Sequence, residues 1–291
     1  MRIFALELNN DRKGREVRKP YIEALLARLP EPDMVFLPEL ALCGYMASRE
    51  IWQYADRDGQ DTARWARDMA EKYNTCIGVG YLELENGDYY NRYLVADKHQ
   101  VFGVVTKSEG EAAVFKRGDF GNLIKTPFGN IAVGICYDAK RRHLYENIQD
   151  QEISLIVFPH GCPADPEKAE EEIEGNDFFC GQYQSAFQVP VVYVNSVGAL
   201  EYMPGVMGAL MRKAGFAMNG RSKIYGGTKA ISCPVREAVG IETELVPRRR
   251  VRDIPFSGED LIPGNWLFRH LVLQPDVKWG IRVYETGKPG R

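Results

Sequence analysis

Three side chains in the sequence are of the types that carry out acyl transfer: a thiol, a carboxylate and an amine. The thiol is Cys136, which follows the apolar run 131–135 and precedes a polar segment with helical potential. In open α/β sheets, ligands gather beyond the carboxyl ends of the strands, and a helix N-terminus stabilises a thiolate. Cys136 is therefore a candidate nucleophile. The alternative is a small buried residue that merely ends a strand.

The carboxylate and the amine also follow predicted strands. Glu39 lies one residue beyond Pro38, after the apolar run 34–37, where partial desolvation would raise its pKa toward that of a useful general base. Lys107 follows the β run 100–106, where it would serve as a fixed cation for a developing oxyanion. Taken singly, each has an ordinary alternative, an exposed loop glutamate or a solvated lysine at a strand end.

The elements that must position these residues alternate between helical and extended patterns. Apolar residues at helical spacing predict helices over about 15–29, 60–73 and 166–187. Extended runs predict strands over 2–8, 34–37, 75–82, 89–96, 100–106, 131–135, 153–158 and 190–194, with several more within 214–246. The last stretch, 264–291, has no clear periodicity. Two such sheet-and-helix halves packed face to face would give one four-layered α/β domain.

Length and composition exclude several classes of function. The 291 residues carry 37 basic and 40 acidic side chains, a net charge of −3, which argues against nucleic acid as a partner. No apolar run is long enough to span a membrane, and the N-terminus is typical of a strand rather than of a signal peptide. The six cysteines form no Cys-x-x-Cys pair, and no phosphate-binding glycine motif occurs, so we expect neither metal nor cofactor. We expect a cytoplasmic protein whose partner is a small-molecule substrate.

The three residues and their neighbours together resemble the nitrilase superfamily, the carbon–nitrogen hydrolases, whose signature is a Glu, a Lys and a Cys in that order. The matching motifs are Phe36-Leu-Pro-Glu39 with Cys43-Gly-Tyr45, Thr106-Lys107, and Gly134-Ile-Cys136-Tyr-Asp138. The similarity runs from residue 1 to about 262 and implies a four-layered α-β-β-α sandwich over 1–262. Residues 263–291 would then be a C-terminal extension that packs on the body or on a partner subunit. The resemblance also implies a homo-oligomer, a dimer or higher.

The resemblance implies a mechanism for these residues. Glu39 takes the thiol proton, Cys136 attacks the carbonyl carbon, and Lys107 with the backbone N–H of Tyr137 holds the oxyanion. A water activated by Glu39 then hydrolyses the thioester. Glu111 stands at the offset of a second, substrate-side carboxylate and is assigned to the catalytic set, with Glu109 as its competitor.

Substrate contacts are expected from residues near the predicted strand ends. Tyr45, Tyr137 and His160 are assigned to substrate binding, although His160 could instead hydrogen-bond a neighbouring loop. The apolar segment 201–211 could add to the pocket wall, or be core. After Asp138 the sequence departs from the family pattern: Lys140 stands where Arg is usual, and the Phe-Pro-Glu that commonly follows is absent.

The predicted reaction is hydrolysis of a small amide or N-carbamoyl compound with release of ammonia. Tyr137, directly after the cysteine, resembles the amidase and carbamoylase branches, whereas nitrilases usually have Trp-Glu at these two places. Nitrile hydrolysis by the same residues is the alternative. Two rival hypotheses are a Cys–His hydrolase that uses His160, and a non-catalytic binding or scaffold protein that keeps the fold.

Overall fold

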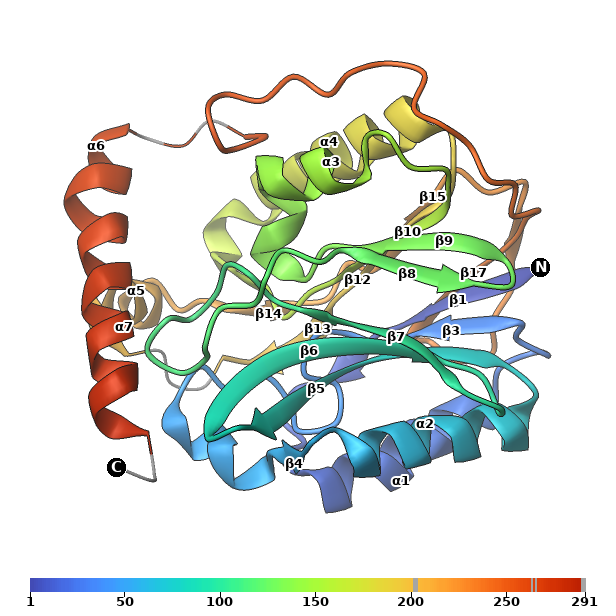
Figure 1. The fold of residues 1–291 in the computed structure, drawn as a ribbon, viewed down its shortest axis with the longest axis horizontal. Helices are drawn as coiled ribbons and strands as arrows, with labels where there is room; N and C mark the ends of the chain where they lie inside the picture. The colour runs from blue at the N-terminus through green and yellow to red at the C-terminus, as the bar shows by residue number, and fades with distance from the viewer. Residues whose placement is uncertain (201–203, 263, 265, 289–291) are drawn as a thin grey trace.

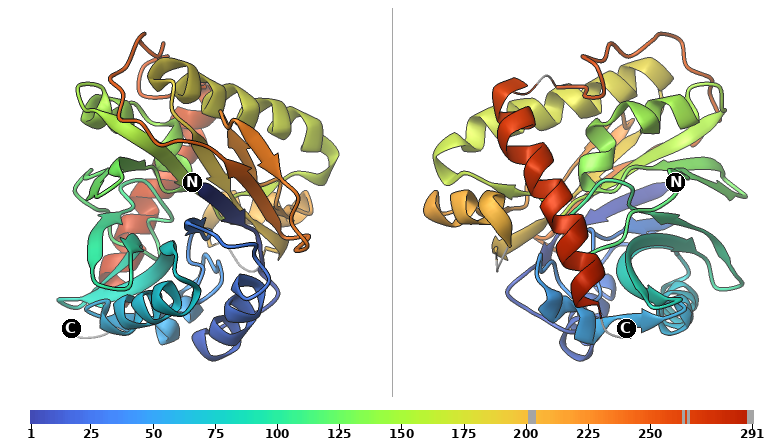
Figure 2. Two further views of the ribbon diagram at one scale, coloured as in Figure 1. Left: turned by 90° about the vertical axis from the view of Figure 1, so that its right-hand side faces the viewer. Right: turned by 60° about the vertical axis from the view of Figure 1, so that its left-hand side comes forward.

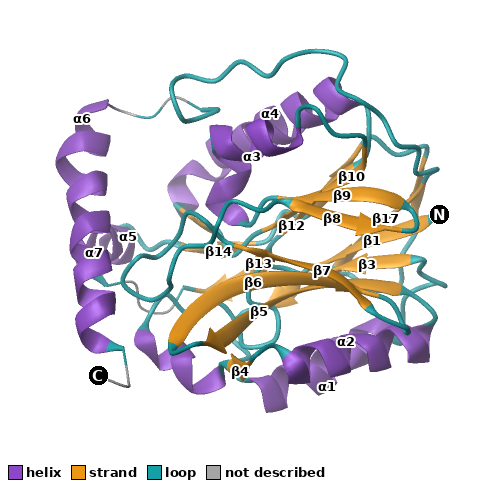
Figure 3. Ribbon diagram, in the orientation of Figure 1, coloured by secondary structure: helices purple, strands orange, loops and turns teal. Residues whose placement is uncertain are grey.

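The fold is seen in a computed structural model that describes residues 1–200, 204–262, 264 and 266–288. Two β-sheets pack face to face, and helices cover the outer face of each (Figures 1 and 3). The helices on one side are α1 (Arg15–Leu26) and α2 (Gln60–Tyr73), and those on the other are α3 (Arg142–Ile148) and α4 (Ala169–Phe187). The chain therefore forms the α-β-β-α sandwich predicted from the sequence.

The first sheet has eight strands in the described part of the chain. Their order is β16 (Lys229–Ile231), β17 (Ala238–Glu242), β1 (Arg2–Leu6), β3 (Met34–Phe36), β5 (Cys76–Glu85), β6 (Asp88–Ala96) and β7 (Val101–Thr106), with β4 (Asp56–Arg57) beside β5. Strands β1, β3 and β5 run parallel, and β6 and β7 continue the sheet as antiparallel neighbours. As a result, β3 and β7 point the same way and end at the same edge.

The second sheet is built around a parallel core. Its order is β15 (Lys223–Tyr225), β12 (Val191–Val194), β10 (Ile153–Pro159), β9 (Gly129–Val133) and β8 (Leu123–Thr126), in which β9, β10 and β12 are parallel. A smaller sheet joins β11 (Pro163–Ala164), β14 (Ala217–Asn219), β13 (Ser196–Ala199) and β2 (Leu8–Asn9).

The alternation of side chains along each strand divides the core into layers. In β1, Phe4 and Leu6 pack in the cluster that includes Trp65 of α2, whereas Ile3 and Ala5 pack between the two sheets. Successive side chains of a strand point to opposite faces, so a strand covered on both faces is apolar throughout. A third cluster lies between the second sheet and α3 and α4.

Most predicted elements are present, with shifted ends. Helix α2 has the predicted bounds, α1 ends at Leu26 rather than near 29, and the predicted helix 166–187 begins as a 3₁₀ turn before α4. In the segment 201–211, residues from Gly205 onward form α5 (Gly205–Lys213), while Tyr202 and Met203 lie outside the described residues.

The C-terminal segment, which shows no periodicity in sequence, is helical. It consists of α6 (Trp266–Phe268), a π-helical turn (Arg269–Leu273) and α7 (Gln274–Gly287). Only Gly280 and Tyr284 of α7 are buried, and large apolar side chains such as Trp279 and Ile281 stay partly exposed. Its inward side contains Val277, Gly280 and Tyr284 at helical spacing, but the exposed apolar residues Trp279 and Ile281 between them obscure the pattern in the sequence.

This C-terminal helix lies along one side of the sandwich, beside α5 (Figures 1 and 2). The hydroxyl of Tyr284 donates to Asp88 at 3.0 Å and accepts from the backbone N–H of Tyr89 at 2.9 Å. Gly280 lets α7 approach closely, because a Cβ there would lie 3.0 Å from the backbone nitrogen of Ala113. The extension therefore packs on the body of its own chain. No helix in the described ranges has the length and apolarity needed to cross a bilayer.

Replacing Tyr284 by Phe should loosen this packing. The change leaves the buried N–H of Tyr89 without its acceptor, and an unpaired buried group costs about 1–3 kcal/mol. We expect the free energy of unfolding in urea to fall by that amount. Tyr73→Phe is the control, because its hydroxyl contacts the carbonyl of Glu23 at a partly exposed position. Equal losses in the two variants would contradict this account of the docking.

Candidate active site

The ends of strands from both sheets meet at one place. Glu39 lies three residues beyond β3, Lys107 directly follows β7, and Cys136 lies three residues beyond β9. The backbone N–H of Gly161, just beyond β10 in the second sheet, donates to Glu39 at 2.8 Å. This bond joins the two sheets at the edge where ligands of α/β proteins usually bind.

Two glycines make room for the Glu39 loop. A Cβ at Gly80 of β5 would lie 2.5 Å from the carbonyl oxygen of Pro38, so only glycine lets this loop pack on the strand. A Cβ at Gly161 would collide with the ring of Tyr45 and lie 3.0 Å from Glu39 Oε2. Close backbone approach on both sides thus encloses the Glu39 carboxylate.

Glu39 is buried and accepts three hydrogen bonds. Its Oε1 accepts from Lys107 Nζ at 2.6 Å and from Asn91 Nδ2 at 2.7 Å, and its Oε2 accepts from Gly161. Burial raises the pKa of Glu39 above its usual value, and the ammonium of Lys107 opposes this rise without cancelling it. The carboxylate is therefore more basic than an ordinary glutamate.

Lys107 is held between two carboxylates. Besides Glu39, its Nζ donates to both oxygens of Glu111, at 3.2 and 3.3 Å. Burial alone would lower the pKa of Lys107, but Glu111 and Glu39 outweigh it and keep that pKa well above its usual value. Lys107 is consequently a permanent cation.

The two carboxylates considered for the second acidic position have different surroundings. Glu111 contacts Lys107 and accepts from the hydroxyl of Tyr45, and these partners lower its pKa although burial opposes them. Glu109 instead pairs with Arg117 at 3.1 Å and Arg141 at 3.3 Å. Of the two, Glu111 is the one that touches the Lys107–Glu39 pair.

Cys136 occupies a strained turn beside a second thiol. Its φ is +51°, in the left-handed region that non-glycine residues seldom adopt and that clusters at functional sites. Its thiol donates a hydrogen bond to Cys162, which raises the pKa of Cys136 well above its usual value and lowers that of Cys162. Burial and the charge of Glu39 raise the Cys136 pKa further, and Lys107 acts against them. The Cys136 side chain is thus a thiol rather than a thiolate.

Asp138 ties the nucleophile turn to the loop that carries Lys107. It is fully buried, and its carboxylate accepts from the backbone N–H groups of Ser108 at 2.8 Å and Glu109 at 2.7 Å. Two short charge-assisted bonds of this kind fix a loop firmly. Any shift of the Cys136 turn would therefore move Lys107 as well.

Sequence reasoning missed the parts that Asn91, Asp138 and Cys162 play here. Asp138 was part of the quoted motif without an assigned role, and Cys162 lies two residues beyond His160 at a predicted strand end. Asn91 gave a weaker signal, a polar residue inside a strand run. Each contacts a residue that is distant in the sequence, and residue spacing does not predict such contacts.

The three residues assigned to substrate contact have different positions. The ring of His160 is buried, its Nδ1 donates to the carbonyl of Phe158 at 3.0 Å, and burial lowers its pKa to about 3. Tyr45 is also buried and donates to Glu111. Tyr137 is partly exposed, and its hydroxyl contacts Asp260 at 3.3 Å. Only Tyr137 faces open space.

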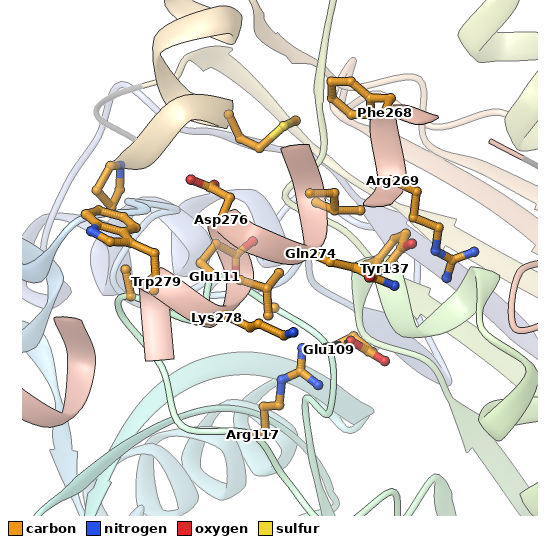
Figure 4. Close-up of a pocket in the computed structure, with 18 of the residues that line it drawn as sticks. Glu109, Glu111, Arg117, Tyr137, Phe268, Arg269, Gln274, Asp276, Lys278 and Trp279 are labelled. Carbon is orange, nitrogen blue, oxygen red and sulfur yellow. Dashed lines mark ion pairs between the residues drawn. The ribbon is translucent and has the colours of Figure 1, made fainter. Parts of the chain in front are cut away.

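That open space is a chamber of about 720 Å³ under the C-terminal helix (Figure 4). Its wall includes Glu111, which contacts Lys107, and Tyr137, which follows Cys136; Glu39, Lys107 and Cys136 themselves do not line it. The opposite wall comes from α5, the π-helical turn and α7. A volume of this size suits a small organic ligand. Among the described residues, no group of three His, Cys, Asp or Glu side chains is arranged to hold a metal ion.

Comparison with known proteins identifies the family of this chain. The family model described as carbon-nitrogen hydrolase matches residues 19–241. The chain belongs to this family. The structure of a carbon–nitrogen hydrolase from Helicobacter pylori superposes with a TM-score of 0.65 at 19% identity, covering 84% of this chain and 89% of that one. This superposition shows that the two chains share a fold.

Two curated relatives match part of this chain. A probable nitrilase of Schizosaccharomyces pombe is 26% identical over 126 residues, covering 40% of this chain and 46% of that protein. A deaminated glutathione amidase of Dictyostelium discoideum is 26% identical over 131 residues, covering 38% and 45%. The chain thus spans less than half the length of these two relatives.

Removing the second thiol of this pair should make Cys136 more acidic. In Cys162→Ala the Cys136 thiol loses its acceptor, so its pKa falls and carbamidomethylation by iodoacetamide begins at lower pH. The measurement is the alkylation rate of the Cys136 peptide against pH by mass spectrometry. Cys233→Ala, which removes a partly exposed cysteine elsewhere, should leave the profile unchanged. If the pH profile of alkylation shifts in neither variant, or in both, the hydrogen bond between Cys136 and Cys162 does not control the Cys136 pKa.

Proposed function

We propose that this protein hydrolyses the C–N bond of a small amide or N-carbamoyl compound through a thioester on Cys136. The observation that carries the proposal is the buried contact of 2.6 Å between Lys107 and Glu39, with Cys136 close enough for both charges to act on its thiol. A base and a fixed cation beside one thiol are the groups that acyl transfer requires.

In the first half-reaction Glu39 takes the proton of the Cys136 thiol, and the sulfur forms a bond to the carbonyl carbon. The carbonyl electron pair moves to oxygen, where the ammonium of Lys107 and the backbone N–H of Tyr137 stabilise the negative charge. Tyr137 lies in the first turn of a 3₁₀ helix (Cys136–Lys140), whose leading N–H groups have no acceptor within the turn. Collapse of this intermediate breaks the C–N bond, and Glu39 returns its proton to the departing nitrogen.

In the second half-reaction water replaces the departed amine. Glu39 takes a proton from water, the hydroxyl oxygen bonds to the thioester carbon, and the same cation holds the new oxyanion. The C–S bond then breaks, and the proton passes to sulfur to restore the Cys136 thiol. The raised pKa of Glu39 suits a group that accepts and returns a proton in each half-reaction.

Glu111 acts in this proposal by holding Lys107, and Tyr45 acts by holding Glu111. The His160 ring supports this assignment indirectly, because a pKa of about 3 leaves it neutral and a poor base for a Cys–His mechanism. The amide or N-carbamoyl class is favoured by Tyr137 after the nucleophile and by the amidase among the relatives.

A screen of ammonia release over primary amides, N-carbamoyl amino acids and nitriles tests the proposal. Cys136→Ala should reduce release to the level without protein, and Lys107→Ala should lower it roughly 100- to 1,000-fold, as for other oxyanion donors. His160→Asn, which keeps a donor near Phe158, should lose far less. Equal ammonia release by Cys136→Ala and the unchanged protein would refute the hydrolase, and the reverse order of the Lys107 and His160 variants would favour a Cys–His mechanism.

The pH profile should report the pKa of Glu39. The base works without its proton, so kcat/KM is lost as pH falls through a midpoint above the ordinary 4.5. Asn91 donates to the carboxylate and lowers this pKa, so Asn91→Ala should move the midpoint to higher pH. Asn130→Ala is the matched control, since that side chain donates to the carbonyl of Glu152 at the surface. A midpoint that stays fixed in Asn91→Ala would exclude Glu39 as the titrating base.

A further inference from the structure

The chamber under the C-terminal helix is lined by charged side chains of both signs. Its lining contains the cationic side chains of Arg117, Arg141, Arg269 and Lys278. Two carboxylates offset them: Glu109 pairs with Arg117 and Arg141, and Asp260 pairs with Arg141 and Arg269. Each of the three arginines therefore has a carboxylate partner.

Lys278 is the cation without an offsetting partner. It comes from α7, and among the residues that the structure describes it makes no ion pair or hydrogen bond, whereas Arg117, Arg141 and Arg269 each have a carboxylate. Figure 4 shows its side chain extending toward the end of the chamber that Glu109 and Arg117 line. An ammonium placed there can pair with an anion that enters the chamber.

The remaining acidic groups of the lining are engaged elsewhere. Asp276 accepts from the backbone N–H of Val206 at 3.0 Å, where α5 begins, and Figure 4 shows it away from Lys278, on the side of Trp279. Glu111 is held by Lys107. Neither carboxylate is placed to satisfy Lys278.

The rest of the lining is mostly apolar. Side chains from three elements contribute to it: Met207, Met211, Phe268, Leu273, Val277 and Trp279. An apolar wall with a few placed polar groups is the usual form of a small-molecule site. Glu111 and Tyr137 adjoin Lys107 and Cys136, and α7 supplies Lys278 to the lining.

We propose that the substrate carries a carboxylate, joined to its scissile amide or N-carbamoyl group through an apolar segment, and that Lys278 is the specificity residue that binds this carboxylate. The inference rests on the proposed function, because it assumes that the reacting group lies beside Glu111 and Tyr137. It assigns a substrate-recognition role to the C-terminal helix, which lies outside the matched family region 19–241.

The test compares substrates that differ only in charge. The probes are a homologous series of ω-carboxyalkanamides and, for each, the uncharged analogue in which an isopropyl group replaces the carboxylate. The variants are Lys278→Gln and the matched control Arg282→Gln, an exposed cation on the same helix that does not line the chamber. Thermal unfolding midpoints confirm that both variants fold.

We expect Lys278→Gln to lower kcat/KM for the preferred acid about 10- to 100-fold, the range for a lost charge-assisted contact, with kcat less affected than KM. It should leave the isopropyl amides unchanged, and Arg282→Gln should change neither class. Added salt should weaken the preference for acids in the unchanged protein and not in Lys278→Gln. Equal effects on both classes, or no preference for the acids, would overturn the inference.

A binding measurement distinguishes failure of this inference from failure of the proposed function. Isothermal titration of the same amides into Cys136→Ser protein, with and without Lys278→Gln, needs no turnover. Tight binding of the acids that is lost on Lys278→Gln supports the recognition site even if no amide releases ammonia, in which case the proposed reaction alone fails. Acids that bind no better than isopropyl amides would reject the site, whatever the activity.

Discussion

The buried ion pair between Lys107 and Glu39 is the interaction on which the rest of the site depends. Removing two charges from water costs several kcal/mol per ion, so such a pair persists only where further hydrogen bonds satisfy the remaining donors and acceptors. Here Glu111, Asn91 and Gly161 supply them. One ammonium faces two carboxylates, and this surplus of negative charge is what holds Lys107 protonated while Glu39 remains basic.

The same network explains why two sheets must pack face to face. Glu39, Asn91 and Lys107 all belong to the first sheet or its loops, whereas Gly161 and Cys136 follow strands of the second. The layer of apolar side chains between the sheets therefore sets the spacing of the charged groups. Because protein interiors are close-packed, a change of volume in that layer would be transmitted to the distance between base and nucleophile.

The sequence predicted correctly those elements and contacts that a single periodic pattern or a single motif determines. Helix α2 appeared with its predicted bounds because Trp65 and Met69 mark one buried face. The order of Glu, Lys and Cys predicted one site, and Lys107 does contact Glu39. A motif places a residue near the site without fixing its side-chain direction, so the hydrogen bonds of Tyr45 to Glu111 and of His160 to Phe158 could not be predicted from it. The C-terminal helix was not predicted, because exposed apolar residues such as Trp279 and Ile281 interrupt the polar positions that would mark its outer face.

The three donors around Glu39 are distributed unequally, and this makes its two oxygens chemically different atoms. Oε1 accepts from a charged ammonium and from an amide, whereas Oε2 accepts only from the neutral backbone of Gly161. The lone pair left on Oε2 is the more basic, and in the proposed reaction protons would enter and leave the carboxyl group through that atom. A rotation of the carboxyl group by half a turn about its terminal C–C bond would exchange the two oxygens and restore the same hydrogen bonds. Which oxygen position exchanges protons is therefore set by the surrounding donors and not by the rotamer of the side chain.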